Sequence, residues 1–291
     1  MPKVSVIIPT YNRPELLRVA LASVYAQTFT DYEVIVIDDG SSPRAFEALL
    51  EYRERKNFRY YETEKNAGGG KARNMGIREA KGEYIAFLDD DDSWAPEKLS
   101  VQVPMLDALP EDVGFSFTGA WIARDGTQYV THVADGVHDF SLQALTDFNG
   151  FLTVTQVMRT KAIREISGFD ETLPSHQEAE MIIRLTQRGY RGLAIDMPLT
   201  HVNADSARAS VGRSLLRRVE GRTMLLAKHN DIYAQHPHAL ARSYFEIGIW
   251  YRTMQDFGKA HDYMVKAYRL RPTSARYFLH MLHTFVRKLY L

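Results

Sequence analysis

Four consecutive aspartates, Asp89 to Asp92, follow directly after the apolar segment Ile85–Leu88. Clustered carboxylates repel one another, and a buried strand offers them little water, so such a run needs a cation or a polar ligand to balance it. Mg²⁺ and Mn²⁺ prefer oxygen ligands and are usually held by one or two carboxylates together with substrate phosphates. We interpret the run as a site for a metal-bound diphosphate and for sugar or ribose hydroxyls. The alternative is an acidic turn in which Asp92 or Ser93 caps a helix after Pro96.

Two further predicted strands also end in polar residues. The β-branched run Val4–Ile8, closed by Pro9, leads into "PTYN", and the strand in "YEVIVI" leads into "DDGSS". Helical spacing of apolar residues follows the first strand, with Asn12 as the expected N-cap and Pro14 early in the helix. Further helices are expected near 46–56 and 72–80, and further strands near 58–62 and 84–88.

The alternation of apolar strands and helices predicts a mainly parallel sheet with helices on both faces. Ligands bind such sheets at the carboxyl ends of the strands, so the three polar strand ends are expected to form one site. After residue 100, "GFSFTGAWIA" and "GTQYVTHV" predict a hairpin. "QEAEMIIRLTQRG" predicts an amphipathic helix with Gly189 as its C-cap, and "RGLAIDMPLTHV" predicts the last strand.

From about Ser206 the sequence is helical, so we expect two domains, residues 1–205 and residues 206–291. The stretch from Tyr244 to Pro272 is similar to a single tetratricopeptide-type helix pair, which needs a neighbour to cover its open face. Residues 205–291 carry 15 Lys and Arg against 6 Asp and Glu, whereas residues 1–204 carry 21 against 30. This basic module is expected either to contact an anionic membrane or a polyanionic acceptor, or to be a solvated face or a subunit contact.

Composition excludes several classes of protein. The chain has 291 residues, 45% of them hydrophobic, and no cysteine, which excludes disulfides, a thiolate nucleophile and Cys-ligated zinc. No apolar run reaches the roughly 18–20 residues of a membrane span. We therefore expect a cytoplasmic protein, with peripheral contact at the inner face of the membrane through the basic helices as an extension. No nucleic-acid partner is expected, and an oligomer is compatible with the sequence.

Three motifs in order resemble the family 2 inverting glycosyltransferases. They are "VSVIIPTYNRPELLRVALASVYAQTF…YEVIVIDDGSS", "NAGGGKARNMGIREAKGEYIAFLDDDDSWAPEKL" and "GFDETLPSHQEAEMIIRL". The resemblance covers roughly residues 3–210. It implies a GT-A (Rossmann-like) fold, a mixed and mainly parallel sheet flanked by helices, followed here by a C-terminal α-helical extension.

The resemblance also implies which residues bind the nucleotide. The tyrosine of "PTYN" lies against the base, the second aspartate of "DDGSS" reads the uracil, and the glycine-bearing loop with its cations meets the diphosphate. The first aspartate, Asp38, is instead expected to stabilise the turn. The expected nucleotide-binding residues are Pro9, Thr10, Tyr11, Asn12, Asp39, Gly70, Lys71, Arg73, Asp89 and Asp90.

For the metal and the chemistry, the resemblance points to three more positions. Asp91 is the expected ligand of Mn²⁺ or Mg²⁺, with His201 either a second ligand or a structural histidine. The family usually has Glu-Asp or Gln-Asp where this chain reads Gln177-Glu178, so Glu178 is the expected general base. Because glutamate is one methylene longer, Glu180 is kept as the alternative base. Both glutamates also complement a helix N-terminus.

These residues together predict an inverting glycosyltransferase that moves a sugar from a nucleotide-diphospho-sugar to a carbohydrate or glycolipid acceptor, in polysaccharide or glycoconjugate synthesis. UDP is the favoured nucleotide because of Asp39; dTDP offers the same imide, and GDP stays open. One alternative is a nucleotidyltransferase, which typically has a glycine-rich basic loop where this chain has "PTYNRPELL". The other is a non-catalytic interaction protein that uses the C-terminal helices.

Overall fold

The computed structural model describes residues 1–146, 151–204 and 214–289. The chain forms two compact units. The first comprises Met1–Ser141, Asn149–Glu171 and Met181–Arg208; the second comprises Leu142–Phe148, Thr172–Glu180 and Ala209–Leu291. The domain boundary expected between residues 205 and 206 lies outside the described residues.

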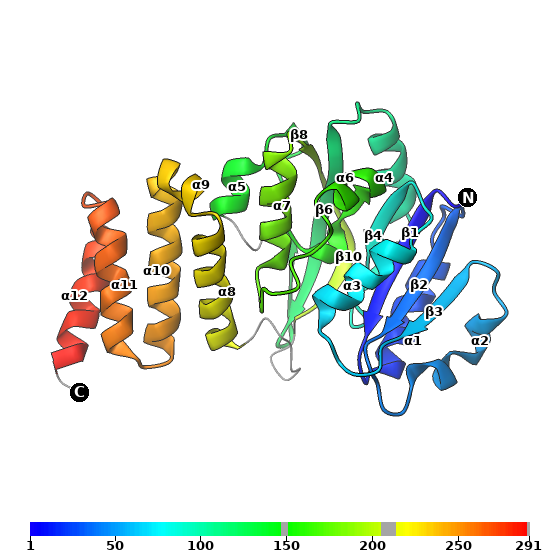
Figure 1. The fold of residues 1–291 in the computed structure, drawn as a ribbon, viewed down its shortest axis with the longest axis horizontal. Helices are drawn as coiled ribbons and strands as arrows, with labels where there is room; N and C mark the ends of the chain where they lie inside the picture. Colours follow the sequence, from blue (N-terminus) through cyan, green and yellow to red (C-terminus); the bar gives the residue numbers. More distant parts are fainter. Residues whose placement is uncertain (147–150, 205–213, 290–291) are drawn as a thin grey trace. The chain divides into compact units, whose positions relative to one another are not determined.

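The first unit is built on one mixed sheet (Figure 1). The strand order is β3-β2-β1-β4-β9-β6-β10-β5, with β7 paired to β6 and β8 paired to β10. The strands are β1 Val4–Thr10, β2 Tyr32–Asp38, β3 Phe58–Glu62, β4 Tyr84–Phe87, β5 Ser93–Trp94, β6 Val113–Arg124, β7 Thr127–Thr131, β8 Gly136–His138, β9 Val157–Arg159 and β10 Arg191–Asn203.

Strand direction confirms the predicted mixed, mainly parallel sheet. Strands β1, β2, β3 and β4 are parallel to one another, and β6 is parallel to β10. Strand β9 is antiparallel to both β4 and β6 and so joins the two parallel groups. The predicted hairpin is also confirmed, since β6 and β7 pair in antiparallel register.

Helices and short 3₁₀ segments connect the strands of this unit. They are α1 Pro14–Tyr25, η1 Ala45–Leu49, α2 Leu50–Arg53, α3 Gly69–Glu79, α4 Lys98–Asp107, α5 Ser141–Thr146, η2 Thr153–Thr155, α6 Thr160–Glu165 and α7 Gln177–Gln187. Helix α5 continues into the second unit, and α7 begins in the second unit and continues into the first.

Opposite faces of β1 are covered by different helices. Val6 and Ile8 share a core cluster with Leu17 and Leu21 of α1. Ile7 points the other way and meets α3 at Gly76, where a Cβ would lie 2.4 Å from the Ile7 side chain. Alternation along a strand explains this division, and the glycine permits the close approach of α3 to the sheet.

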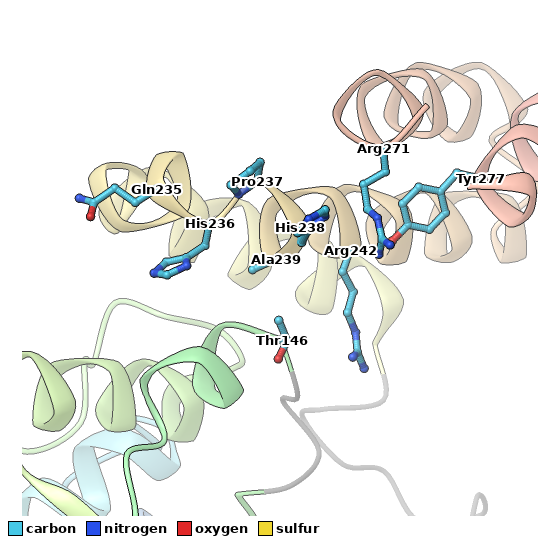
Figure 2. A pocket seen from close by; sticks show the side chains of 9 residues that line it. All are labelled: Thr146, Gln235, His236, Pro237, His238, Ala239, Arg242, Arg271 and Tyr277. Atoms are coloured by element: carbon cyan, nitrogen blue, oxygen red, sulfur yellow. The ribbon is translucent and has the colours of Figure 1, made fainter. Parts of the chain in front are cut away.

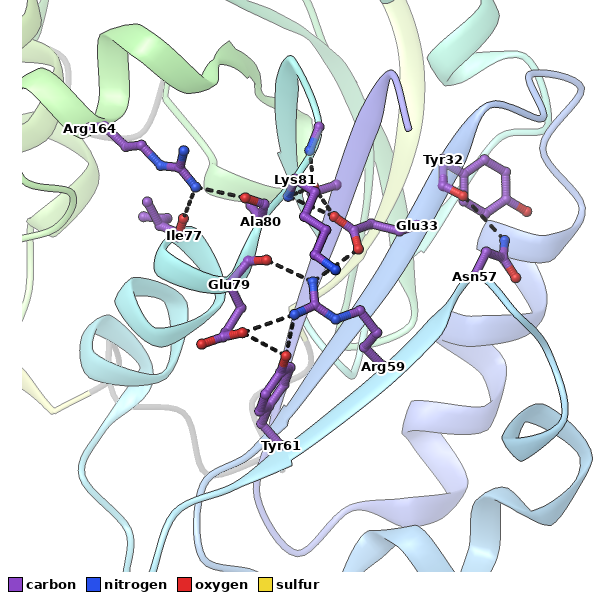
Figure 3. A network of polar contacts seen from close by, with 12 residues as sticks. Tyr32, Glu33, Asn57, Arg59, Tyr61, Ile77, Glu79, Ala80, Lys81 and Arg164 are labelled. Carbon is purple, nitrogen blue, oxygen red and sulfur yellow. Dashed lines mark hydrogen bonds and ion pairs between the residues drawn. The ribbon is translucent and has the colours of Figure 1, made fainter. Parts of the chain in front are cut away.

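An ion-pair network ties β2, β3 and α3 together (Figure 3). Arg59 donates to the carboxylate of Glu33 at 3.1 Å and to Glu79, both to its carbonyl at 2.7 Å and to its carboxylate at 2.9 Å. Glu33 is only 5% exposed and also accepts from the Lys81 amide at 2.7 Å. Since a buried carboxylate is costly without donors, Arg59 is the cation that makes Glu33 tolerable here.

Helices of the second unit follow one another with short connections (Figure 1). Their apolar contacts form a small core of Ala241, Phe245, Met264, Ala267 and Tyr277. Within the described residues, no helix is both long and apolar enough to span a bilayer. The helices are α8 Leu215–Lys228, α9 Asn230–Gln235, α10 Pro237–Thr253, α11 Phe257–Leu270 and α12 Ala275–Leu289.

Local details differ from the sequence-based expectations at helix starts. Helix α1 has Arg13, not Asn12, at its N-cap, because Asn12 adopts a positive φ of 55° in the preceding turn. Strand β1 continues through Pro9 to Thr10, where Pro9 is opposite Ile37 of β2. Helix α3 begins at Gly69, three residues earlier than predicted.

Candidate functional site

The three polar strand ends lie at one edge of the sheet. Strand β1 is central, parallel to β2 on one side and to β4 on the other, so their carboxyl ends meet. The Asp39 amide donates to the Thr10 carbonyl at 2.8 Å, and Thr10 Oγ1 donates to Asp90 at 2.8 Å. The prediction that these segments come together is therefore confirmed.

The acidic run forms a turn and not a continuation of β4. Its carboxylates nevertheless alternate in burial: Asp90 and Asp92 are 5% and 7% exposed, whereas Asp89 and Asp91 are half-buried. Asp92 accepts the amide of Asn203 at 2.9 Å, so it anchors the end of β10. The acidic turn of the alternative interpretation is therefore present, but the cap that went with it is wrong, since Ser93 belongs to β5 and the N-cap of α4 is Glu97.

Arg13 is a site residue that the sequence reasoning missed. Its guanidinium donates to Asp90 at 3.2 Å and to Asp91 at 3.0 Å. The available signal was a cation within one turn of the polar end of the first strand, a position where it can reach the neighbouring strand ends. In this conformation Arg13 supplies positive charge to the acidic run.

Burial raises the pKa of Asp90 to about 6, although its hydrogen bond from Thr10 and the charge of Arg13 act in the opposite direction. Burial and the neighbouring Asp89 charge also raise the pKa of Asp92 well above its ordinary range. Desolvation is the larger cause in both cases, so a cation bound beside these carboxylates would favour their ionised forms.

Asp39 organises the loop before α3. Its carboxylate accepts from Thr63 Oγ1 at 3.0 Å, from the Ala67 amide at 2.9 Å and from the Gly68 amide at 2.7 Å. A carboxylate has about four acceptor sites, so three of them are used by these donors. Gly40 is required beside it, since its φ is +82° and a Cβ would lie 2.6 Å from the Asn66 amide.

Asp38 has the turn-stabilising position that was expected. It accepts the amide of Ser41 at 2.8 Å, the amide of Ala45 at 2.9 Å and the hydroxyl of Tyr60. Its carboxylate is fully buried, so it is committed to the protein interior.

The glycine-bearing loop continues into α3. Gly70 is buried in the first turn and Lys71 is exposed. Arg73 is 9% exposed and forms an ion pair with Asp89, which links α3 to the acidic run. Tyr11 is 44% exposed at the same edge, a suitable position for a ring that stacks on a base.

Residues suited to a divalent cation are present, although no group of three or more His, Asp or Glu side chains in the described residues forms a complete metal cage. Asp89 and Asp91 have side chains that are 34% and 18% exposed. Such hard oxygen donors fit Mg²⁺ or Mn²⁺ when substrate phosphates complete the coordination. The donor set therefore fits a cation shared with a ligand.

His201 lies at the same end of the unit. It is opposite Ser93 in the β10–β5 pair. Ser93 itself lies two residues after Asp91 in the sequence. Its imidazole is exposed and is stacked on Trp121, with ring centroids 6.3 Å apart. Its role as a metal ligand stays a prediction.

The two candidate bases begin α7, in the part of that helix that belongs to the second unit. Glu178 is half-buried. Glu180 is 0% exposed and accepts from Lys228 Nζ at 2.7 Å and His229 Nε2 at 3.2 Å. Because the carboxylate of Glu180 is sealed and already bound to two cationic or polar donors, it is poorly suited to receive a proton from a substrate.

Comparison with known proteins identifies relatives. The model of glycosyl transferase family 2 matches residues 5–160. An uncharacterized glycosyltransferase of Rickettsia felis is 32% identical over 200 residues, which cover 69% of this chain and 33% of the relative. Staphylococcus aureus TarS, named poly(ribitol-phosphate) beta-N-acetylglucosaminyltransferase, is 37% identical over 116 residues, 39% of this chain and 20% of TarS. The chain spans only 27–33% of the length of three Rickettsia relatives.

Solved structures share the fold. TarS 1–349 in complex with UDP-GlcNAc has a TM-score of 0.71 and 19% identity, covering 99% of this chain and 91% of that chain. A mannosyltransferase from Pyrobaculum calidifontis, in complex with GDP-Man and Mn²⁺, has a TM-score of 0.62 and 18% identity, covering 99% and 87%. These similarities confirm the predicted GT-A fold with C-terminal helices.

Proposed function

The chain belongs to glycosyltransferase family 2, and on that premise we propose that it transfers a sugar from a nucleotide-diphospho-sugar to an acceptor hydroxyl. The observation that carries the proposal is the pair of hydrogen bonds that links Thr10 to Asp39 and to Asp90 at adjacent strand ends. These hydrogen bonds hold polar residues on rigid elements at one edge of the sheet, which supports their assignment to a base, a ribose and a diphosphate.

UDP is the proposed nucleotide. Asp39 keeps one of about four acceptor sites beyond its three protein donors, which is enough for the single imide N–H of uracil. Exposed Tyr11 offers a ring face to the base, with Pro9, Thr10 and Asn12 beside it. The TarS complex with UDP-GlcNAc supports a UDP-sugar donor. The residues proposed to meet the ribose and diphosphate are Gly70, Lys71, Arg73, Asp89 and Asp90.

A divalent cation, Mn²⁺ or Mg²⁺, is proposed to be held by Asp91, with His201 as a second ligand. When bound, it would neutralise the charge that develops on the departing nucleoside diphosphate. The Mn²⁺ complex of the Pyrobaculum mannosyltransferase supports the use of a divalent cation. Of the chain's own residues, Arg13 lies within 3.0 Å of Asp91 and must adjust its contact as the ligand set changes.

Glu178 is proposed as the general base of a single inverting displacement. A carboxylate near the acceptor takes the hydroxyl proton as the oxygen attacks the anomeric carbon on the face opposite the leaving group. Because the attack is direct, the anomeric configuration inverts and no covalent sugar–enzyme intermediate forms.

The experiment compares Glu178→Gln with Glu180→Gln, the same change two residues apart. With UDP-sugar and acceptor extract, Glu178→Gln is expected to lose transfer by at least about a hundredfold while calorimetry gives unchanged UDP affinity. Glu180→Gln is expected to lower thermal stability through its lost contacts with Lys228 and His229, with turnover largely kept. Near-normal turnover in Glu178→Gln would refute the assignment of Glu178 as the base. Absence of UDP binding to the wild-type chain would refute the proposed function.

The acceptor is proposed to be a carbohydrate or a glycolipid of polysaccharide or glycoconjugate synthesis.

Helix α12 is proposed to lie on an anionic membrane. Six exposed apolar residues of α12 fall within an arc of about 120° on the helix, with basic side chains on both flanks. Such a pattern is typical of helices that lie in a membrane interface. The six residues are Phe278, Leu279, Leu282, Phe285, Val286 and Leu289.

Co-sedimentation with vesicles tests the membrane contact. Leu279→Asp/Leu282→Asp is expected to abolish binding to vesicles that contain phosphatidylglycerol. Leu216→Asp is the matched control, because Leu216 is 66% exposed but lies on α8. Equal sedimentation of both variants would refute membrane attachment through α12.

A further inference from the structure

A pocket of about 400 Å³ lies within the second unit, where the start of α10 meets the turn between α11 and α12 (Figure 2). Four of its lining side chains are basic or can become so: His236, His238, Arg242 and Arg271. No acidic residue lines the pocket within the described part of the chain. The volume falls in the range of small-ligand sites, and the lining favours an anion.

The two arginines of the pocket are not fully neutralised by their surroundings. Arg242 contacts Glu246 at 3.3 Å, but the same carboxylate also pairs with Arg222 at 3.0 Å. Arg222 is only 1% exposed, and Glu246 is one of the groups that stabilise its buried charge. Arg271 has no acidic partner among the described residues. Two guanidinium groups thus share the carboxylate of Glu246, and the pocket-lining Arg271 has no carboxylate of its own among the described residues.

One buried side chain of the lining has a fixed position beside these exposed arginines. Tyr277 is 7% exposed and its ring is stacked on Phe245 at a centroid distance of 4.6 Å, so its hydroxyl has a defined position. His236 is the N-cap of α10, and Pro237 begins this helix of 17 residues, whose N-terminus carries partial positive charge. Donors therefore approach the pocket from α10 and from both sides of the α11–α12 turn (Figure 2).

We propose that this pocket binds a phosphate group, and that the group belongs to a phosphodiester-containing acceptor chain. The two guanidinium groups, the phenol and the two imidazoles of the lining come from several elements, and such a set of donors suits the four oxygens of a tetrahedral phosphate better than a planar carboxylate. The role in acceptor binding rests on the proposed glycosyltransferase function, whereas phosphate binding itself does not. In that role the pocket holds a segment of the acceptor away from the residue that is glycosylated.

Calorimetry on the full chain tests the pocket with three probes: inorganic phosphate, a phosphodiester-linked glycerol phosphate oligomer and an oligogalacturonate. Arg271→Gln is expected to weaken phosphate binding by about tenfold or more, as is typical when a charge-assisted hydrogen bond is removed. Arg242→Gln/Arg271→Gln is expected to weaken it further. Arg269→Gln is the matched control, because Arg269 is exposed near the same end of α11 but does not line the pocket. Thermal melts verify that each variant is folded.

Donor hydrolysis, measured as UDP release without acceptor, is expected to be unchanged in all three variants. The phosphodiester oligomer is expected to bind more tightly than inorganic phosphate and to compete with it. Absence of phosphate binding to the wild-type chain, or an equal loss of phosphate affinity in Arg269→Gln, would overturn the proposal that this pocket binds phosphate. Oligogalacturonate binding as tight as the oligomer would overturn the preference for phosphate, and binding of inorganic phosphate alone would overturn the acceptor role. Phosphate binding without any donor hydrolysis would leave the pocket standing and count against the proposed function.

Discussion

Replacement of Arg13 by glutamine tests how the acidic run is balanced. The pKa of Asp90 is about 6, above its ordinary 3.8, so the folded protein holds this proton more tightly than the unfolded chain does. Ionisation of Asp90 therefore costs stability as the pH rises from about 4 through 6. Arg13, at 3.2 Å, reduces that cost, and its removal is expected to raise the pKa of Asp90 further.

The expected loss of stability depends on pH in a way that can be worked out. At pH 5 Asp90 is mainly protonated with or without Arg13, so only the half-buried contact with Asp91 is lost, at a cost of up to about 1 kcal/mol. At pH 8 the wild-type Asp90 is ionised, whereas the variant must keep the proton or bury an unpaired charge. Since pH 8 is two units above a pKa of about 6, the variant is expected to lose at most about 2.7 kcal/mol more of its unfolding free energy at pH 8 than at pH 5.

Urea unfolding in EDTA at pH 5 and at pH 8 measures this difference. Arg18→Gln is the control, since Arg18 lies on the same helix but pairs with exposed glutamates, and it is expected to change stability by less than about 0.5 kcal/mol at either pH. When Mn²⁺ replaces EDTA in the buffer, the difference in unfolding free energy between wild type and variant at pH 8 is expected to become smaller, because a bound cation replaces the lost charge. Equal losses at pH 5 and pH 8 would show that Arg13 stabilises by packing and would refute the charge-balance argument.

The remaining predictions concern Asp39 and Arg59. Asp39→Asn places an amide NH₂ group or a weaker acceptor against the Ala67 and Gly68 amides, so UDP affinity is expected to fall at least about tenfold by calorimetry; retention of wild-type affinity would contradict the role of Asp39. Arg59→Met leaves the carboxylate of Glu33, 5% exposed, without its cation and is expected to cost about 3 kcal/mol in urea unfolding with UDP affinity unchanged. A loss below about 1 kcal/mol would mean that the backbone amides satisfy Glu33 unaided.

Much of the sheet and of the nucleotide edge was predictable because both depend on local patterns. Continuous apolar runs predicted the parallel strands, and the polar residues after β1, β2 and β4 predicted a shared edge. Parallel topology alone brings successive carboxyl ends together, so no knowledge of side-chain packing was needed.

Side-chain partners could not be predicted in the same way. Arg13 meets Asp90 and Asp91, nearly eighty residues away, only because α1 begins where β4 ends in space. Glu178 and Glu180 are two residues apart and chemically alike, yet only Glu180 is sealed from solvent by Lys228 and His229. Burial depends on elements that pack from distant parts of the chain.

By itself, then, the sequence determined the family, the order of strands and helices and the chemical groups at the nucleotide edge, since each follows from motif, period or strand direction. Tertiary structure alone decided which carboxylates are buried, which cation balances them and that Arg242 and Arg271 line one pocket. The physical reason is that periodicity reports how a segment meets its immediate layer, whereas desolvation and charge pairing depend on atoms contributed by segments far apart in the chain.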